Sequence, residues 1–202
     1  MKKETARSLV LASSSPRRRE LLGHFGLPFS ITVPEVDESL LPGEDPSAHV
    51  GRLAVAKAEA VAGEASGDLV VAGDTVVVLD GEIIGKPGGP GEARSMLRRL
   101  SGRTHSVYSG VAVADASTGE MRTAVVRSGV TMAVISPGEI RRYVETGEPL
   151  DKAGAYAVQG RGGEYVIAVE GSVTNVIGLP LRELHRLLEA AGCRVPLPDI
   201  PL

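Results

Sequence analysis

The amino-acid sequence predicts an α/β fold, in which helices flank a mixed, twisted sheet. Short apolar segments rich in Val, Ile and Leu alternate along the chain with segments of helical periodicity. Hairpin signals between some of the predicted strands indicate antiparallel pairs beside parallel ones. The chain has 202 residues, of which 43% are hydrophobic and 23% charged, so it is long enough to bury one large core. This length is typical of one large domain, or of one domain folded as two lobes.

Strands are expected where short apolar runs end at turn residues. The segments predicted to be strands are 9–12, 29–33, 69–72, 76–79, 82–84, 107–114, 124–135, 165–169 and 173–177. The runs 69–72 and 76–79 are joined by Gly73-Asp74-Thr75, and Asp80-Gly81 predicts a hairpin after them. These runs are expected to form the middle of the sheet.

Helices are expected after cap signals, such as a Ser or Asp that stands directly before Pro at the first helical position. The predicted helices begin near residues 16, 46, 92, 137 and 180. Ser136 and Glu139 have the spacing of a capping box. The Pro-rich segment 196–202 is expected to be a loose tail.

The composition excludes several classes of function. Aromatic residues make up only 3% of the chain and Trp is absent, so platforms for stacking nucleic-acid bases are not expected. The net charge of −3 gives no general attraction for a nucleic-acid backbone. The single cysteine, Cys193, excludes a disulfide framework and favours a reducing compartment. No apolar run is long enough to span a bilayer, so we expect a cytoplasmic protein without a membrane partner.

The segment Ser13-Ser14-Ser15-Pro16-Arg17-Arg18-Arg19 places hydroxyl and guanidinium groups at a predicted helix start. Exposed N–H groups, the helix dipole and Arg donors all favour a phosphate there. The alternative is a Ser cap followed by solvated Arg side chains. Because cations in the first turn oppose the helix dipole, a compensating anion is expected and phosphate binding is the favoured interpretation.

Asp74 is the most informative single residue, because it interrupts two apolar runs. An ionised carboxylate at the end of a buried strand is costly unless a cation or hydrogen-bond donors meet it. A role as metal ligand or general base would satisfy that need. The alternative is a carboxylate that caps its own turn through Thr75.

Other polar residues are weaker candidates, because acidic loops and single lysines are commonly just solvated. One carboxylate of the loop after residue 33 could share a divalent cation with Asp74. The segment Gly81 to Lys86 lacks the spacing of a P-loop, although Lys86 could still reach a phosphate. The candidates of this grade are Glu35, Asp37, Glu38, Lys57, Lys86, Asp151 and Lys152.

Six motifs, taken together and in chain order, make the pattern specific. They are Ser13-Ser14-Ser15-Pro16-Arg17-Arg18, Gly73-Asp74-Thr75-Val76, Gly85-Lys86-Pro87, Leu150-Asp151-Lys152-Ala153-Gly154-Ala155-Tyr156, Gln159-Gly160 and Gly178-Leu179-Pro180-Leu181. This set resembles the Maf family of nucleoside triphosphate pyrophosphatases, from about Leu9 to Leu188. Each motif alone is weak, whereas the ordered set is strong.

The resemblance implies a single domain over 1–202 with two lobes around a cleft, similar to the inosine-triphosphate pyrophosphatase fold. It also implies that the chain cleaves a nucleoside triphosphate to the monophosphate and pyrophosphate. A divalent cation, Mg²⁺ or Mn²⁺, is implied as the cofactor and a homodimer as the assembly.

The resemblance also assigns roles to matching positions. Asp74 corresponds to the proton acceptor, and Glu38, Lys57 and Lys86 correspond to residues for metal and phosphates, with Glu38 and Asp74 as metal ligands. Ser13 and Ser15 belong to the phosphate-binding segment. Arg17, Thr75 and Gln159 match the branch that acts on dTTP and UTP, as opposed to the branch that acts on 7-methyl-GTP.

Two other functions stay open at this point. The family name is tied to inhibition of septum formation, so the chain could be a nucleotide-binding regulator of cell division without turnover. Such a regulator could lose Asp74, which this chain has. A plain structural partner protein is the other alternative, and nucleotide with metal would then not stabilise it.

Overall fold

The computed structural model describes residues 8–65 and 68–198. Its strands form a seven-stranded sheet in the order β2-β1-β3-β5-β6-β7, with β4 paired to β3. Strand β1 pairs in parallel with β2 and β3, whereas the pairs β3–β4 and β6–β7 are antiparallel. The predicted class, an α/β fold with a mixed sheet and flanking helices, is confirmed.

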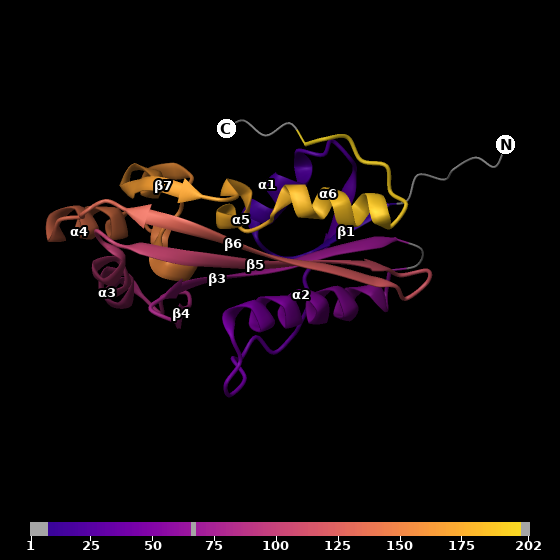
Figure 1. Cartoon of the computed structure of the whole chain (residues 1–202), viewed down its shortest axis with the longest axis horizontal. Coiled ribbons are helices and arrows are strands. Elements are labelled where there is room, and N and C mark those ends of the chain that lie inside the picture. The colour runs from indigo at the N-terminus through magenta and orange to yellow at the C-terminus, as the bar shows by residue number, and fades with distance from the viewer. Residues whose placement is uncertain (1–7, 66–67, 199–202) are drawn as a thin grey trace. The chain divides into compact units, whose positions relative to one another are not determined.

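The strands are β1 (Leu9–Ala12), β2 (Phe29–Thr32), β3 (Leu69–Leu79), β4 (Glu82–Ile84), β5 (Thr104–Asp115), β6 (Met121–Met132) and β7 (Val166–Glu170). The helices are α1 (Pro16–Gly23), α2 (Pro46–Ala62), α3 (Pro90–Leu100), α4 (Pro137–Glu145), α5 (Val173–Ile177) and α6 (Leu181–Ala190). Short 3-10 helices are η1 (Glu148–Asp151), η2 (Ala153–Ala155) and η3 (Gly160–Tyr165). Figure 1 labels the α-helices and most of the strands.

The chain divides into two compact units. Unit 1 comprises Met1–Asp74, Ser109–Val125 and Gly178–Leu202, and unit 2 comprises Thr75–Tyr108 and Val126–Ile177. Strands β3, β5 and β6 each contribute residues to both units.

In unit 1, small side chains let α2 lie close to the sheet. Ala54 and Ala58 of α2 share a buried cluster with alternate residues of β1, β3 and β5. Gly110 of β5 makes the closest approach, since a Cβ atom there would lie 2.1 Å from the carbonyl oxygen of Val50. Helix α2 thus covers one face of this part of the sheet, and α1 and α6 lie on the other (Figure 1).

Unit 2 has its own apolar core, in which α3 packs against α4. Ile140, Tyr143 and Val144 of α4 are buried there with Leu97 and Leu100 of α3. Strands β3 to β7, η2 and nearby loops supply further apolar side chains of this cluster.

The cap and turn signals predicted several boundaries correctly. Ser15 and Asp45 are the N-caps of α1 and α2, and Ser136 with Glu139 forms the predicted capping box of α4. Asp80 and Gly81 adopt positive φ values of 54° and 82° in the hairpin between β3 and β4. Two adjacent positive φ values match the twist of a tight hairpin.

Two predicted segments were wrong. The runs 69–72 and 76–79 form one continuous strand, β3, so Asp74 lies inside a strand and not at a strand end. Segment 173–177 is the short helix α5 and not a strand. There Ser172 Oγ accepts a hydrogen bond from the Asn175 N–H at 3.2 Å, and Asn175 Nδ2 donates to the Val107 carbonyl at 3.1 Å. These polar contacts outweigh the β-propensity of the Val and Thr residues.

The remaining boundaries differ by a few residues. Strand β7 begins at Val166, after η3, while β5 and β6 begin before their predicted starts. Of the predicted tail 196–202, residues 199–202 lie outside the described residues.

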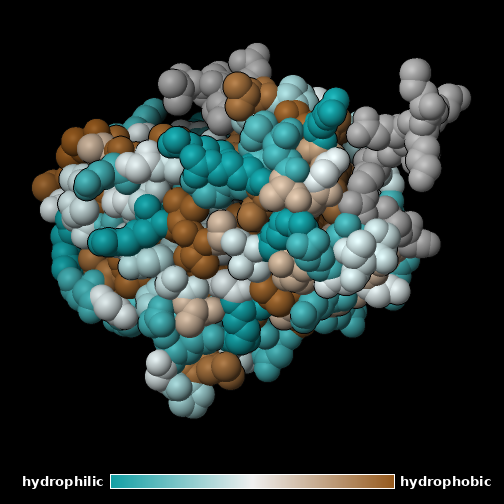
Figure 2. Space-filling model, turned by 45° about the vertical axis from the view of Figure 1, so that its right-hand side comes forward, coloured by the Kyte–Doolittle hydropathy of each residue, from teal (hydrophilic) through white to brown (hydrophobic). Residues whose placement is uncertain are grey.

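Hydrophobic side chains on the face drawn in Figure 2 are set among hydrophilic ones. The exposed large hydrophobic residues come from strands and loops, and they are Ile31, Val33, Leu40, Leu41, Val125, Val134, Ile167, Val173 and Leu197. Within residues 8–65 and 68–198, no helix combines the length and hydropathy needed to cross a membrane.

We expect Gly110→Ala to destabilise unit 1, because the new methyl group would overlap the α2 backbone. Overpacking of this kind costs about 1–3 kcal/mol, and each kcal/mol lowers the melting temperature by about 2–4 °C in a chain of this size. Gly91→Ala is the matched control, because a Cβ atom there meets nothing within 4 Å. Equal melting temperatures for the two variants would contradict the close packing of α2.

Candidate functional site

Lys57 lies at the centre of a cluster of charges in unit 1. Its Nζ lies 2.7 Å from Glu38 Oε1 and 2.7 Å from Asp74 Oδ1. The side chain of Lys57 is only 7% exposed and that of Asp74 11%, whereas Glu38 is 56% exposed. Lys57 follows Val50 and Leu53 on the buried face of α2, so its hydrocarbon stem is packed and only its ammonium meets the carboxylates.

Asp74 points into this cluster from the middle of β3. Because the strand is continuous, no turn is present for Asp74 to cap, and the turn-capping alternative is wrong. Its neighbour Gly73 lies beside Arg18, since a Cβ atom there would be in ordinary contact with Arg18 Nε at 3.5 Å, and it would closely approach the Gly110 carbonyl oxygen at 3.1 Å. The carboxylate that the sequence singled out is therefore buried and met by a cation.

Arg18 is a residue of this cluster that sequence reasoning did not single out. Its Nε donates a hydrogen bond to the Gly178 carbonyl at 2.9 Å, and its Nη1 donates to Ser13 Oγ at 3.4 Å. Burial lowers the pKa of Arg18, and the charges of Asp74 and Glu38 oppose that shift. Arg18 thus adds a second positive charge near both carboxylates. The run of three arginines was visible, but a single short helix does not reveal which of them turns inward.

The Ser segment shapes the start of α1. Ser13 Oγ accepts a hydrogen bond from the Ser15 N–H at 3.2 Å, and Ser15 Oγ accepts from the Arg18 N–H at 3.4 Å. Ser13 is buried and Arg17 half-buried. The first turn of α1 contains no acidic residue, so no carboxylate of that turn offsets the positive end of the helix dipole.

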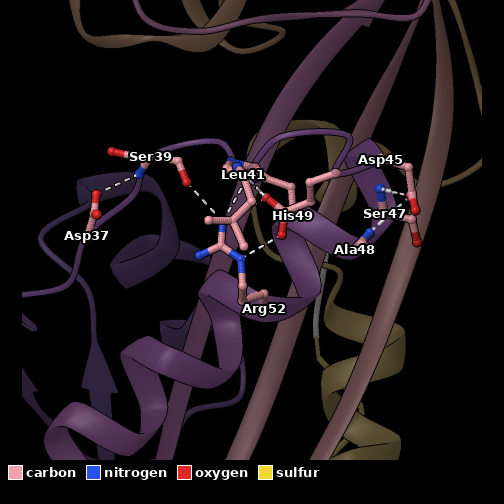
Figure 3. Close-up of polar contacts among 9 residues, drawn as sticks. Asp37, Ser39, Leu41, Asp45, Ser47, Ala48, His49 and Arg52 are labelled. Atoms are coloured by element: carbon pink, nitrogen blue, oxygen red, sulfur yellow. Dashed lines mark hydrogen bonds and ion pairs between the residues drawn. The ribbon is translucent and has the colours of Figure 1, made fainter.

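Of the acidic loop residues Glu35, Asp37 and Glu38 that the sequence singled out, Glu38 alone pairs with Lys57 in the described part of the chain. Asp37 Oδ1 instead accepts a hydrogen bond from the Ser39 N–H at 2.9 Å, as Figure 3 shows. Glu35 is exposed. The same loop continues to Glu44, whose side chain is only 8% exposed and forms a salt bridge with Arg52 of α2.

The other predicted site residues, Thr75, Lys86 and Gln159, belong to unit 2. Thr75 follows Asp74 in β3, and Lys86 is exposed just after β4. The carbonyl of Gly85 accepts a hydrogen bond from the Gly154 N–H at 3.0 Å, which ties the Lys86 loop to η2. Gln159 precedes η3.

Glu148 organises the loop that carries Gln159. Its carboxylate accepts hydrogen bonds from the N–H groups of Arg161 at 3.1 Å and Gly162 at 3.0 Å, and from Tyr143 Oη at 2.8 Å. Burial acts to raise the pKa of Glu148, but the bonds from Gly162, Tyr143 and Arg161 outweigh it and the net shift is downward. Lys152 Nζ donates to the Glu148 carbonyl at 2.6 Å and pairs with Asp151, so both of these candidates have local structural roles.

The residues present fit a divalent cation only in part. Within the described residues, no group of three or more His, Cys, Asp and Glu side chains is placed to hold a metal ion. Glu38 and Asp74 nevertheless direct carboxylate oxygens toward one cation, Lys57 Nζ. Mg²⁺ is typically held by one or two carboxylates together with substrate phosphates. This donor set therefore fits a metal ion that is also bound by a phosphate ligand.

Comparison with known proteins identifies the family. The family described as "Maf-like protein" matches residues 8–191. The chain belongs to the Maf family. A Maf relative from Myxococcus xanthus (strain DK1622), named "dTTP/UTP pyrophosphatase", is 53% identical over 94% of each chain. A relative from Moorella thermoacetica with the same name is 51% identical over 93% of this chain and 96% of its own.

The fold of this Maf protein also resembles a solved structure. The Ham1 protein of Staphylococcus aureus superposes with a TM-score of 0.53 over 92% of this chain and 100% of its own, at 15% sequence identity. That likeness concerns the fold alone. The predicted family and the predicted fold class are both confirmed, and the site residues stay predictions.

We expect Glu148→Gln to destabilise the protein at pH 7, because an amide cannot accept all the hydrogen bonds that the carboxylate accepts. Loss of such bonds costs about 1–3 kcal/mol. Since the pKa of Glu148 is lowered from its ordinary value of 4.5, its stabilisation is present above pH 4.5 and is lost as the pH falls further. Thermal unfolding of wild type and variant should therefore differ at pH 7 and converge in acid.

The matched control is Glu145→Gln, an exposed glutamate of α4. This change should leave the melting temperature unchanged at both pH values. If the difference in melting temperature between wild type and Glu148→Gln stayed constant in acid, the stabilising role of the Glu148 charge would be contradicted.

Proposed function

We propose that this Maf protein hydrolyses dTTP and UTP to the nucleoside monophosphate and pyrophosphate, and thus is a nucleoside triphosphate pyrophosphatase. The observation that carries the proposal is its 53% identity, over 94% of the chain, to a protein named "dTTP/UTP pyrophosphatase". The buried Asp74–Lys57 pair, with Arg18 nearby, supports it, because hydrolysis of a phosphoanhydride needs a base and cations.

In the proposed reaction, Asp74 accepts a proton from the attacking water. The water oxygen bonds to phosphorus as the bridging P–O bond between the α and β phosphates breaks, and pyrophosphate leaves. Lys57, Arg17 and Lys86 bind phosphate oxygens, with Ser13 and Ser15 at the start of α1. Glu38 and Asp74 would hold Mg²⁺ or Mn²⁺, and the cation would supply charge neutralisation on the phosphates.

Thr75, Arg17 and Gln159 select the base in this proposal. Gln159 has an amide that both donates and accepts hydrogen bonds, so it can pair with the O4 and N3 edge that uracil and thymine share. Cytosine presents an amino group at that edge, and purines are larger. We also propose that the protein is a homodimer in the cytoplasm, and the single cysteine suits such a reducing compartment.

The test of the proposed function is to incubate the pure protein with a panel of nucleotides and Mg²⁺ or Mn²⁺, and to measure pyrophosphate. Release of pyrophosphate from dTTP and UTP, abolished by a chelator, supports the proposal. Orthophosphate as the first product would contradict it. Binding of nucleotide without turnover would favour the alternative, a regulator of septum formation.

We expect Asp74→Asn to keep the fold and to lower turnover about 10²–10⁴-fold, the usual contribution of a general base. The amide keeps an oxygen acceptor for Lys57 but cannot take a proton from water. Steady-state kinetics with UTP and a thermal melt should be measured together. Glu35→Gln, at an exposed position of the acidic loop, is the control. Near-normal activity with an unchanged melt would reject Asp74 as the base.

We expect wild type to cleave UTP and dTTP faster than CTP, ATP or GTP, and Gln159→Ala to narrow the UTP-to-CTP ratio of kcat/KM. Each buried hydrogen-bonding group left unpaired by the wrong base costs about 1–3 kcal/mol. The metal concentration needed for half-maximal activity should change by a smaller factor than the UTP-to-CTP ratio does, because Gln159 is not a proposed metal ligand. A wild-type preference for 7-methyl-GTP or inosine triphosphate would show that the branch assignment is wrong.

A further inference from the structure

Glu38 is a proposed metal ligand, yet it is placed on a segment without regular structure. The segment 33–45 connects β2 to α2 and contains no helix or strand. The Glu38 side chain is 56% exposed, so packing does not fix its position. A metal ligand needs such fixing, because supporting contacts set the orientation of the ligating oxygens. The question is what holds this loop against α2.

One buried carboxylate, Glu44, joins the loop to the helix. Arg52 of α2 donates to it as a two-pronged fork, from Nε to Oε1 at 2.6 Å and from Nη2 to Oε2 at 2.7 Å. His49 Nδ1 lies 2.9 Å from Oε2, and the Leu41 N–H donates to Oε2 at 3.2 Å. These contacts, the fork from Arg52 first, lower the pKa of Glu44 to about 2, so it is ionised at neutral pH.

Arg52 reaches beyond Glu44 to the backbone next to Glu38. Its Nη2 also donates to the Ser39 carbonyl at 3.0 Å. Figure 3 shows Arg52 and His49 on α2 directed toward Ser39 and Leu41 of the loop. Ser39 is further fixed by Asp37, which accepts a hydrogen bond from its N–H at 2.9 Å. Ser39, the residue that follows Glu38, is thus held at both its N–H group and its carbonyl.

Two cations of the same helix therefore hold the loop at neighbouring points. Lys57 binds the Glu38 carboxylate at 2.7 Å, and Arg52 binds the Ser39 carbonyl while it is oriented by Glu44. An Arg fork suits this task, because its planar donors can serve a carboxylate and a carbonyl at the same time. A lysine has no such fork.

We propose that Glu44 and Arg52 are positioning residues, which hold the loop so that the Glu38 carboxylate stays directed at the position shared with Asp74. The inference rests on the proposed function, because it assigns Glu38 to the metal. Loss of a supporting contact of this kind typically lowers metal affinity or activity about 10–100-fold.

The experiment compares Arg52→Met, which removes the fork, with Arg52→Lys, which keeps the charge. We expect Arg52→Met to raise at least 10-fold the Mn²⁺ concentration for half-maximal hydrolysis of UTP, with a smaller change in kcat at saturating Mn²⁺. Arg52→Lys should recover less than half of the loss. Bound Mn²⁺ is counted independently by electron paramagnetic resonance, with the non-hydrolysable α,β-methylene analogue of UTP present. Arg99→Met, which breaks the exposed Arg99–Glu82 pair, is the control.

A double-mutant cycle separates a positioning role from general loss of stability. If Arg52 acts through Glu38, Arg52→Met should change Mn²⁺ binding in wild type but not in a Glu38→Gln background. An equal loss in both backgrounds, or no change in wild type, would overturn the inference.

A separate measurement distinguishes failure of the proposed function. If wild type releases no pyrophosphate from UTP or dTTP, the proposed function fails, and the loop is tested by amide hydrogen exchange over residues 37–44. Faster exchange in Arg52→Met than in Arg99→Met then supports the inference that Arg52 holds the loop in place. Unchanged exchange overturns it.

Discussion

The interaction on which unit 1 depends is the sharing of one ammonium group, Lys57 Nζ, by Asp74 and Glu38. Burying an unpaired charge is costly, and Lys57 supplies the cation that pairs with the Asp74 carboxylate. Helix α2 brings the cation there only because Gly110 of β5 leaves room for the helix backbone. The small residues of the sheet therefore serve the electrostatics of the site as much as the packing of the core.

Each unit also contains one carboxylate that accepts several hydrogen bonds and thereby holds a neighbouring segment in place. Glu148 gathers backbone N–H groups and the Tyr143 hydroxyl, as Glu44 gathers Arg52 and the Leu41 N–H in unit 1. In unit 1 the ionised carboxylate fixes a loop without regular structure, and in unit 2 it fixes the start of the short 3-10 helix η3. Charge-assisted hydrogen bonds are stronger than neutral ones, so a single side chain can replace a strand or a helix as the support.

Local signals predicted most of the fold, because caps and turns depend on residues close in sequence. Asp74 could be singled out as well, since a carboxylate between apolar runs is conspicuous in any sequence. The strand predicted at 173–177 was wrong because Asn175 bonds both to Ser172, three residues before it, and to Val107, which is distant in sequence. Arg18 and Arg52 were missed for the same reason. Their roles arise from contacts with Gly178 and Glu44, and no spacing or periodicity of the sequence encodes those contacts.

The balance of charges in the cluster explains why the metal ion and the nucleotide are expected to bind together. The carboxylates of Asp74 and Glu38 are offset by Lys57 and Arg18, so a free divalent cation is attracted less than it would be by two unpaired carboxylates. Under the proposed function, a triphosphate would add negative charge and oxygen ligands at the same place. Its phosphates would give Lys57 a new partner, and the carboxylates would then be available to the metal. In the proposed reaction the nucleotide therefore completes the ligand set that the described residues supply only in part.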